Sequence, residues 1–253
     1  MIREQPKISY IWVYLSGNPL FALVITLAAY QLGNLLYQRT NNNPFANPVA
    51  IAVVLIALVL YLIDMPYQKY FEGAQFVHFL LGTATVALAV PIYKGFSILK
   101  TRLIPLTVAL LCGGVVSIAS AVGIATFMGA DTTIIGALYP KSVTTPIAMG
   151  IAERLSVSPT LTAVFAVVTG ILGAILGSFM LNLLGMNAWW QRGFAMGVAA
   201  HGIGTSRAFA VHPEAGLYAS LAMGMHGILG AILFPLLASY ICFDTCIAQL
   251  AYQ

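Results

Sequence analysis

The chain has 253 residues, of which 60% are hydrophobic and 7% are charged, and its formal net charge is +4. Soluble domains carry roughly 25% charged residues, so this composition excludes a protein whose whole surface faces water. The small net charge gives no reason to expect nucleic acid as a partner. The chain has long apolar runs instead of the alternating strands of an outer-membrane barrel. The composition therefore predicts an all-α, polytopic helical membrane protein.

The apolar runs predict about eight membrane segments, because a helix needs about 20 apolar residues to cross a bilayer. They are expected at residues 8–37, 48–63, 74–93, 103–128, 131–155, 160–184, 193–211 and 215–243. Asn18-Pro19 interrupts the first run. No signal peptide is expected in residues 1–9, which lack a short apolar region followed by a cleavage site. Lys/Arg are spread nearly evenly over the two sides, so the positive-inside rule leaves the orientation open.

The two halves of the chain resemble each other in three places. Asn18-Pro19 aligns with Thr145-Pro146, Asn47-Pro48 with Ser158-Pro159, and Gly82–Thr85 with Gly202–Thr205. We therefore expect one transmembrane domain over residues 1–253, built from repeat halves 8–128 and 131–243. Four spans in each half would make the repeat parallel, and an odd number would make it inverted. The sequence leaves both possibilities open.

The stretch Tyr139–Met149 (Tyr-Pro-Lys-Ser-Val-Thr-Thr-Pro-Ile-Ala-Met) places a lysine and three hydroxyls inside an apolar span. Irregular backbone at membrane depth is tolerated only where it is buried in protein or lines a wet cavity. Pro146 is expected to begin a second half-helix, whose N-terminal N–H groups attract anions. We predict a solute site at this break. The alternative is that Lys141 reaches the membrane surface from a plain turn between helices.

A second polar cluster follows at residues 200–207, where Gly202 and Gly204 are expected to loosen a helix. Arg207 offers a planar fork suited to a carboxylate. The alternative is that Arg207 reaches lipid headgroups and His201 is hydrogen-bonded in the core. In the N-terminal half, Thr83 and Thr85 are expected to add hydroxyl contacts. The complete set of predicted substrate-binding residues is Lys141, Ser142, Thr144, Thr145, His201, Thr205, Ser206, Arg207, Asn47, Thr83 and Thr85.

The remaining residues that could carry chemistry indicate packing. His78 and His226 are isolated on apolar helices and are expected to be hydrogen-bonded core histidines, with a proton relay as the alternative. The glycines at 170, 173 and 177 have the spacing of helix contacts. No catalytic triad or phosphate-binding loop is present, and the three cysteines match no metal spacing. We therefore expect neither an enzyme nor a bound cofactor or metal.

Several motifs resemble the LrgB/CidB family, and the likeness covers nearly the whole chain. Its most specific motif is Pro140–Pro146, reading Pro-Lys-Ser-Val-Thr-Thr-Pro. Thr83 stands where the family usually has proline, which bears on how sharply the third segment breaks. His226 stands where the family has an apolar or small residue. The other matching segments are Asn47-Pro48, Leu80–Pro91, Leu161–Ala163, Thr169–Ala174 and His201–Arg207.

The resemblance implies a multi-pass protein of the bacterial inner membrane and two possible functions. Bacterial members are described as antiholin-like modulators of murein hydrolase export and autolysis that act with a small holin-like LrgA/CidA partner. The plastid relative is a glycolate/glycerate translocator, and bacterial members have been tied to pyruvate and similar acids.

The residues favour transport, because two polar breaks with one cation each suit a carboxylate and a holin-like pore does not need them. We expect an alternating-access carrier of small monocarboxylates in the lipid bilayer, acting as a homo-oligomer, a dimer, with the antiholin-like regulator as the alternative. Coupling to protons is expected rather than to sodium.

Overall fold

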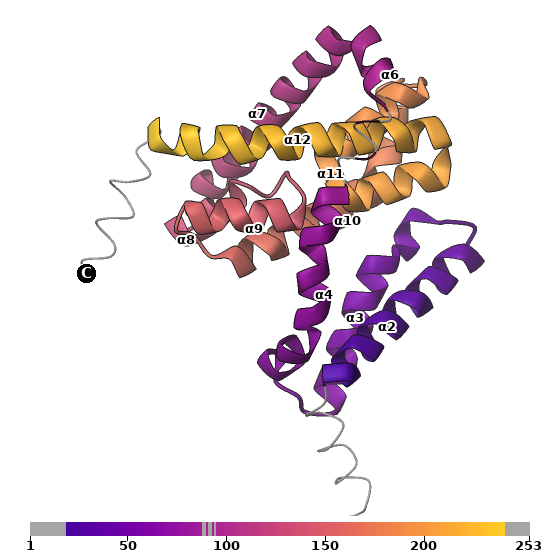
Figure 1. Ribbon diagram of the computed structural model, residues 1–253, viewed down its shortest axis with the longest axis vertical. Helices are drawn as coiled ribbons and strands as arrows, with labels where there is room; N and C mark the ends of the chain where they lie inside the picture. The colour runs from indigo at the N-terminus through magenta and orange to yellow at the C-terminus, as the bar shows by residue number, and fades with distance from the viewer. Residues whose placement is uncertain (1–18, 88–89, 91–92, 94, 241–253) are drawn as a thin grey trace, which may run out of the picture. The chain divides into compact units, whose positions relative to one another are not determined.

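The computed structural model of the protein describes residues 19–87, 90, 93 and 95–240, and within these ranges every regular element is a helix. The predicted all-α fold is thus confirmed for this part of the chain. Figure 1 shows the elements in chain order. They are α2 (Pro19–Arg39), the 3₁₀ helix η1 (Pro44–Ala46), α3 (Pro48–Leu62), α4 (Tyr67–Ala87), α6 (Phe96–Thr101), α7 (Leu103–Phe127), α8 (Thr132–Leu138), α9 (Thr145–Arg154), α10 (Pro159–Leu183), α11 (Trp189–Val211) and α12 (Pro213–Tyr240).

The chain forms two compact units, an N-terminal unit of residues 1–84 and a C-terminal unit of residues 85–253. In the N-terminal unit, α2 and α3 form a helical hairpin, visible in Figure 1. Its apolar core includes Ala22, Leu60 and Tyr70. The Tyr70 hydroxyl is 2.6 Å from Oγ1 of Thr26, so a hydrogen bond ties α4 to α2.

The asparagines between α2 and α3 explain how this hairpin turns. Asn41 and Asn42 have φ of 55° and 57°, a left-handed conformation that asparagine tolerates better than most residues. Asn43 accepts a hydrogen bond from the backbone N–H of Phe45 and caps η1. Asn47, a predicted site residue, caps α3 by accepting from the backbone N–H groups of residues 49 and 50. Its side-chain oxygen thus has a structural role.

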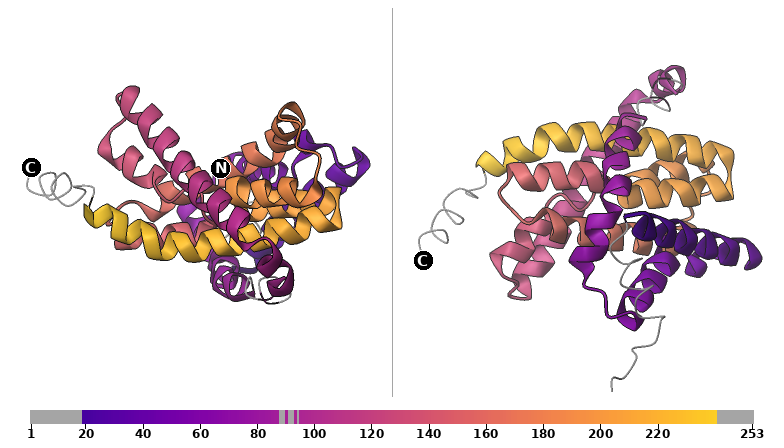
Figure 2. Two further views of the ribbon diagram at one scale, coloured as in Figure 1. Left: turned by 90° about the horizontal axis from the view of Figure 1, so that it is seen from above. Right: turned by 60° about the horizontal axis from the view of Figure 1, so that its bottom comes forward.

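In the C-terminal unit, α11 and α12 lie side by side, as Figures 1 and 2 show. Leu106 and Leu110 of α7 pack with Phe194 of α11 and Tyr218 of α12 in one buried apolar cluster. Glycines bring the helices close. A Cβ at Gly197 of α11 would lie 2.7 Å from the Cβ of residue 222 on α12 and still closer to a backbone carbonyl of α12.

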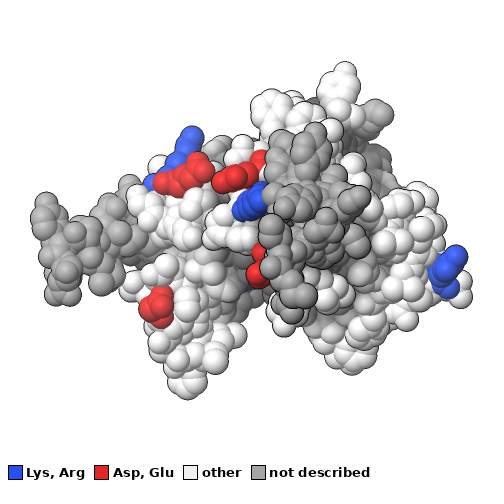
Figure 3. Space-filling model, turned by 90° about the horizontal axis from the view of Figure 1, so that it is seen from below, with Lys and Arg blue, Asp and Glu red and all other residues white. Residues whose placement is uncertain are grey.

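Four helices within the described residues are long and apolar enough to cross a membrane. They are Leu20–Arg39, Leu103–Phe127, Pro159–Leu183 and Pro213–Phe234. Large apolar side chains such as Ile104 and Val116 are exposed on α7, which is typical of a surface that faces lipid. Figure 3 shows only a few charged side chains among the described residues of one face. The number of membrane segments, about eight, stays a prediction.

The expected segment 131–155 consists of two short helices, α8 and α9, as the predicted second half-helix requires. The short helix α6 lies between the expected segments 74–93 and 103–128. By contrast, α4 runs without interruption through Gly82–Thr85, so the third segment has no break there. At the second pair of aligned positions the halves do match, because α3 and α10 both begin with proline after a capping Asn47 or Ser158. Asn18, on which the first pair rests, lies outside the described residues.

Candidate functional site

The break predicted in the stretch 139–149 is present between α8 and α9, where residues 139–144 lie outside both helices. Asp131 caps α8 by accepting a hydrogen bond from the backbone N–H of Ile134 at 2.9 Å. After only seven residues α8 ends at Leu138, and the ten residues of α9 begin at Thr145, with Pro146 in the first turn. At 1.5 Å per residue, these helices are about 10 and 15 Å long, so neither crosses a bilayer alone.

Apolar contacts hold the irregular backbone of this break. Tyr139 and Val143 share a buried cluster with Ala166 of α10 and Phe234 of α12. The rings of Tyr139 and Phe234 meet edge to face, with centroids 5.7 Å apart. Gly230 of α12 makes room for the break, because a Cβ there would lie 2.7 Å from Cγ1 of Val143. The break is therefore buried in protein, as irregular backbone at membrane depth requires.

The polar groups of the break have few partners. The Lys141 ammonium donates to Oγ of Ser117 on α7 at 3.4 Å. The side chains of Ser142 and Thr144 are 0% and 8% exposed, and neither hydroxyl has a hydrogen-bond partner among the described residues. Thr144 occupies the N-cap position of α9 without a side-chain cap. A buried polar group left unsatisfied costs about 1–3 kcal/mol, so an oxygen-rich ligand would stabilise this segment.

A cavity of about 830 Å³ lies between α7, α10 and α11, and Lys141 contributes to its wall. Ser117 and Thr169 line the cavity with Lys141, while Leu106, Met180 and Trp190 are among its apolar lining residues. Ser117 and Thr169 were not predicted. Each is one of several hydroxyl residues in an otherwise apolar helix, such as Ser120 one turn beyond Ser117, so nothing in the sequence distinguishes them.

The second predicted break is a kink in α11 at His201. This residue has φ of 39° and ψ of −127°, while the helix continues on both sides. Its Nε2 lies 2.9 Å from the carbonyl oxygen of Ala166 on α10. Gly170 permits this approach, because a Cβ there would lie 2.8 Å from Cε1 of His201. The prediction of an interrupted helix is confirmed, with the unusual backbone at the histidine and not at Gly202 or Gly204.

His226 of α12 contacts the backbone of α11 in the turn before this kink. Its Nδ1 is 3.2 Å from the carbonyl oxygen of Val198. In an unbroken helix that carbonyl would accept from the N–H of Gly202. The His226 side chain is buried, as predicted for a core histidine. Its Nε2 has no partner among the described residues and faces Gly114 of α7, where a Cβ would lie 3.3 Å away.

The backbone at His201 gives the first testable prediction. His201→Ala and His201→Gly both lose the hydrogen bond to Ala166, but only glycine adopts a positive φ without strain. Strain of this kind costs roughly 1–3 kcal/mol, more than the roughly 0.4–1 kcal/mol by which glycine stabilises the unfolded chain. Thermal unfolding in detergent should rank wild type above His201→Gly and His201→Ala last. An alanine variant more stable than the glycine variant would contradict a kink at this residue.

The other predicted site residues are more dispersed. Thr205 donates to the sulfur of Met223 on α12 at 3.8 Å, Thr145 is half-buried and Ser206 is exposed. Thr83 is exposed and donates to a backbone carbonyl of its own helix, α4. The side chain of Thr85 lies outside the described residues.

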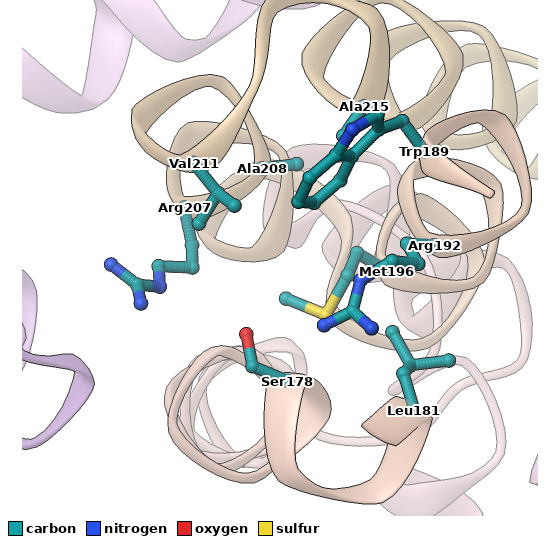
Figure 4. Close-up of a pocket in the computed structure, with 9 residues that line it drawn as sticks. All are labelled: Ser178, Leu181, Trp189, Arg192, Met196, Arg207, Ala208, Val211 and Ala215. Carbon is teal, nitrogen blue, oxygen red and sulfur yellow. The ribbon is translucent and has the colours of Figure 1, made fainter. Parts of the chain in front are cut away.

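Arg207 lines a separate, small hollow of about 20 Å³. Figure 4 shows the side chains of Arg192 and Met196 at this hollow, with the guanidinium of Arg207 directed away from it. Arg192 donates to Oδ1 of Asn182 at 2.7 Å and to a backbone carbonyl at 2.9 Å. Leu181 and Met196 line both the hollow and the larger cavity. Lys141 and Arg207 therefore lie at neighbouring cavities and not in one pocket.

Comparison with known proteins supports the likeness seen in the motifs. The chain is 34% identical to the uncharacterized protein YxaC of Bacillus subtilis over 214 residues, covering 85% of this chain and 93% of that protein. It is 32% identical to the uncharacterized protein YwbG of the same organism over 219 residues, covering 87% and 97%. The holin-like protein CidB of Staphylococcus epidermidis is 28% identical over 215 residues, covering 85% and 93%.

No solved structure matches the chain. The LrgB-like family matches residues 26–240, which include both helix breaks and, from end to end, every described helix except α2. The resemblance inferred from the Pro-Lys-Ser-Val-Thr-Thr-Pro motif is thereby confirmed, and the chain belongs to the LrgB-like family.

Proposed function

We propose that this protein is a carrier of small monocarboxylates such as glycolate, glycerate or pyruvate. The observation that carries the proposal is the Lys141 ammonium in the wall of the 830 Å³ cavity. Within the described residues, its hydrogen-bond partner is the neutral Ser117. A lysine at membrane depth is costly without a partner or a wet cavity. A carboxylate entering the cavity would neutralise this charge.

The neighbouring groups suit the same ligand. The hydroxyls of Ser142 and Thr144 are buried without a partner among the described residues, and with Thr145 they surround the N-terminus of α9, which favours anions. His201 and Thr205 lie at the second break. We assign these residues to orienting the substrate, and we assign Ser206 and Arg207 to the adjoining hollow on its path.

The two breaks also fit alternating access. Carriers commonly hold their substrate between discontinuous helices and move one bundle against the other. In this chain both breaks contact α10, since Ala166 packs with Tyr139 and Val143 and accepts the hydrogen bond of His201. We propose about eight membrane segments in the bacterial inner membrane and a homodimer as the working unit.

The second candidate function is regulation of a holin-like partner. It is supported by relatives named holin-like protein CidB in Staphylococcus epidermidis and Staphylococcus aureus. A regulator of this kind needs no solute cavity, but it must form a complex in the membrane. Co-expression with a small holin-like membrane protein, followed by affinity purification, should yield a stable complex if regulation is the function.

Uptake into liposomes tests the carrier directly. Purified protein in liposomes should accumulate labelled glycolate, glycerate or pyruvate with saturable kinetics, because a carrier has a finite number of sites. Empty liposomes and excess unlabelled acid provide the controls. Flux without saturation would indicate a pore, and absence of flux combined with a stable holin-like complex would favour the regulator.

A further inference from the structure

The large cavity is long, and it follows the helix axes. Along α7 its lining runs from Pro105 to Ser117, and along α10 it runs from Thr169 to Leu181. Each of these stretches rises roughly 18 Å at 1.5 Å per residue. A two- or three-carbon acid bound at one end would occupy a small part of this length.

The polar groups of the cavity are unevenly placed along it. Lys141, Ser117 and Thr169 lie together at one end, and Lys141 and Ser117 are directly hydrogen-bonded. Between the ends, the side chains that line it are apolar, with Ala109, Leu172 and Leu176 among them.

At the other end are Trp190 and Gln191, and the guanidinium of Arg102 stacks on the Trp190 ring at 4.2 Å. A tryptophan with a cation on its face is typical of the membrane–water interface. The cavity thus resembles a slot with a buried cationic end and an interfacial end.

We propose that this slot binds monocarboxylates that carry an extended hydrocarbon chain, with the carboxylate at Lys141 and the chain pointing towards Trp190. The proposal rests on the proposed function only in placing the carboxylate at Lys141. The apolar middle of the slot adds affinity for every methylene buried in it, about threefold to fourfold per group.

The orientation follows from the partners of the two cations. The Lys141 ammonium lies next to hydroxyls, and a hydrocarbon tail beside it would leave a buried charge uncompensated. Arg102 already lies over an aromatic face, which stabilises its charge without a carboxylate. The carboxylate is therefore better placed at Lys141 than at Arg102.

Quenching of tryptophan fluorescence by bromine tests this arrangement. The full-length protein in liposomes is titrated with dodecanoate brominated at its terminal carbon, with dodecanoate brominated next to the carboxylate, and with terminally brominated dodecanol. The alcohol enters the membrane but has no charge for Lys141. Trp190→Phe removes the reporter inside the slot. Trp189→Phe is the matched control, because Trp189 lines the small hollow and not the slot.

The terminally brominated acid should quench emission saturably and several-fold more than the alcohol. This difference between acid and alcohol should disappear in Trp190→Phe and persist in Trp189→Phe. In Lys141→Ala, half-maximal quenching should need at least tenfold more acid. Ala109→Phe, which places a larger side chain in the slot from α7, should also reduce the acid-specific quenching. Equal quenching by acid and alcohol would overturn the proposal, and stronger quenching by the acid brominated next to its carboxylate would overturn the orientation.

This experiment does not depend on transport. Quenching as expected in a protein that takes up no acid would support the slot and reject the carrier. Uptake of short acids by a protein that shows no acid-specific quenching would support the carrier and reject the slot.

Discussion

Lys141→Ala should abolish measurable uptake of a labelled monocarboxylate. The substitution removes the one cationic side chain among the described residues that line the cavity and leaves the carboxylate with neutral polar groups such as Ser117 and Thr169. Removing one partner of a buried charge pair costs about 2–5 kcal/mol, which corresponds to at least ~30-fold in affinity. Initial uptake rates over a range of substrate concentrations in liposomes, at matched protein content, measure the effect.

Three further variants test whether the loss of uptake is caused by the missing charge at Lys141. Lys141→Arg keeps the charge and should retain part of the uptake. Lys69→Ala changes an exposed lysine of the N-terminal unit and should behave as wild type. Arg207→Ala should reduce uptake less than Lys141→Ala, because Arg207 lines the neighbouring hollow. Normal uptake in both Lys141→Ala and Arg207→Ala would refute the site.

Gly197→Ala should prevent stable folding. A Cβ at this position would lie 2.7 Å from the Cβ of Ala222 and closer still to the carbonyl oxygen of Ala219. Contacts with backbone atoms cannot be relieved by a rotamer change, so α11 and α12 would have to separate. Overpacking costs typically 1–3 kcal/mol and occasionally more, and here it affects the most extensive helix contact in the C-terminal unit.

Gly150→Ala provides the matched control, because a Cβ built there on α9 has no described atom within 4 Å beyond its chain neighbours and the nearby backbone of its own helix. Alanine is favoured over glycine inside helices by up to about 1 kcal/mol, so this variant should be as stable as wild type or slightly more stable. Size-exclusion chromatography after heating in detergent measures the heat resistance of both variants. Equal heat resistance of Gly197→Ala and wild type would contradict the close packing of α11 on α12.

The helix breaks could be predicted because their causes are local. Pro146 with the polar residues before it is incompatible with one continuous apolar helix, and α9 indeed begins beside this proline. Gly202 and Gly204 indicated a weakened helix, and the kink lies next to them at His201. The glycines of α10 were expected at helix contacts, and Gly170 and Gly173 do approach side chains of α11.

The residues that line the cavity could not be predicted, because they depend on which faces of the helices pack together. Ser117 is sequence-distant from Lys141 and meets it only through the packing of α7. His226 was expected in the core, but its bond to Val198 beside the kink requires knowing that α12 lies on α11. Asn47 was among the predicted site residues, and its role in capping α3 could not be deduced from its type alone.

Thr83 lies inside the continuous helix α4. The resemblance to the family implies proline at this position, which would remove a backbone donor. Threonine keeps that donor, and its hydroxyl donates to the carbonyl oxygen of Leu80 within α4. α4 continues to Ala87, so this helix has no break at Gly82–Thr85 to pair with the kink at His201.

Counterflow tests the central claim, carriage of a monocarboxylate by the cavity at Lys141, most directly. Liposomes containing the protein are loaded with unlabelled pyruvate and diluted into a trace of labelled pyruvate. A carrier should accumulate label transiently above its external concentration, since exchange continues while the unlabelled acid leaves, and Lys141→Ala should abolish this overshoot. Label that only equilibrates, or an overshoot unchanged in Lys141→Ala, would contradict the account.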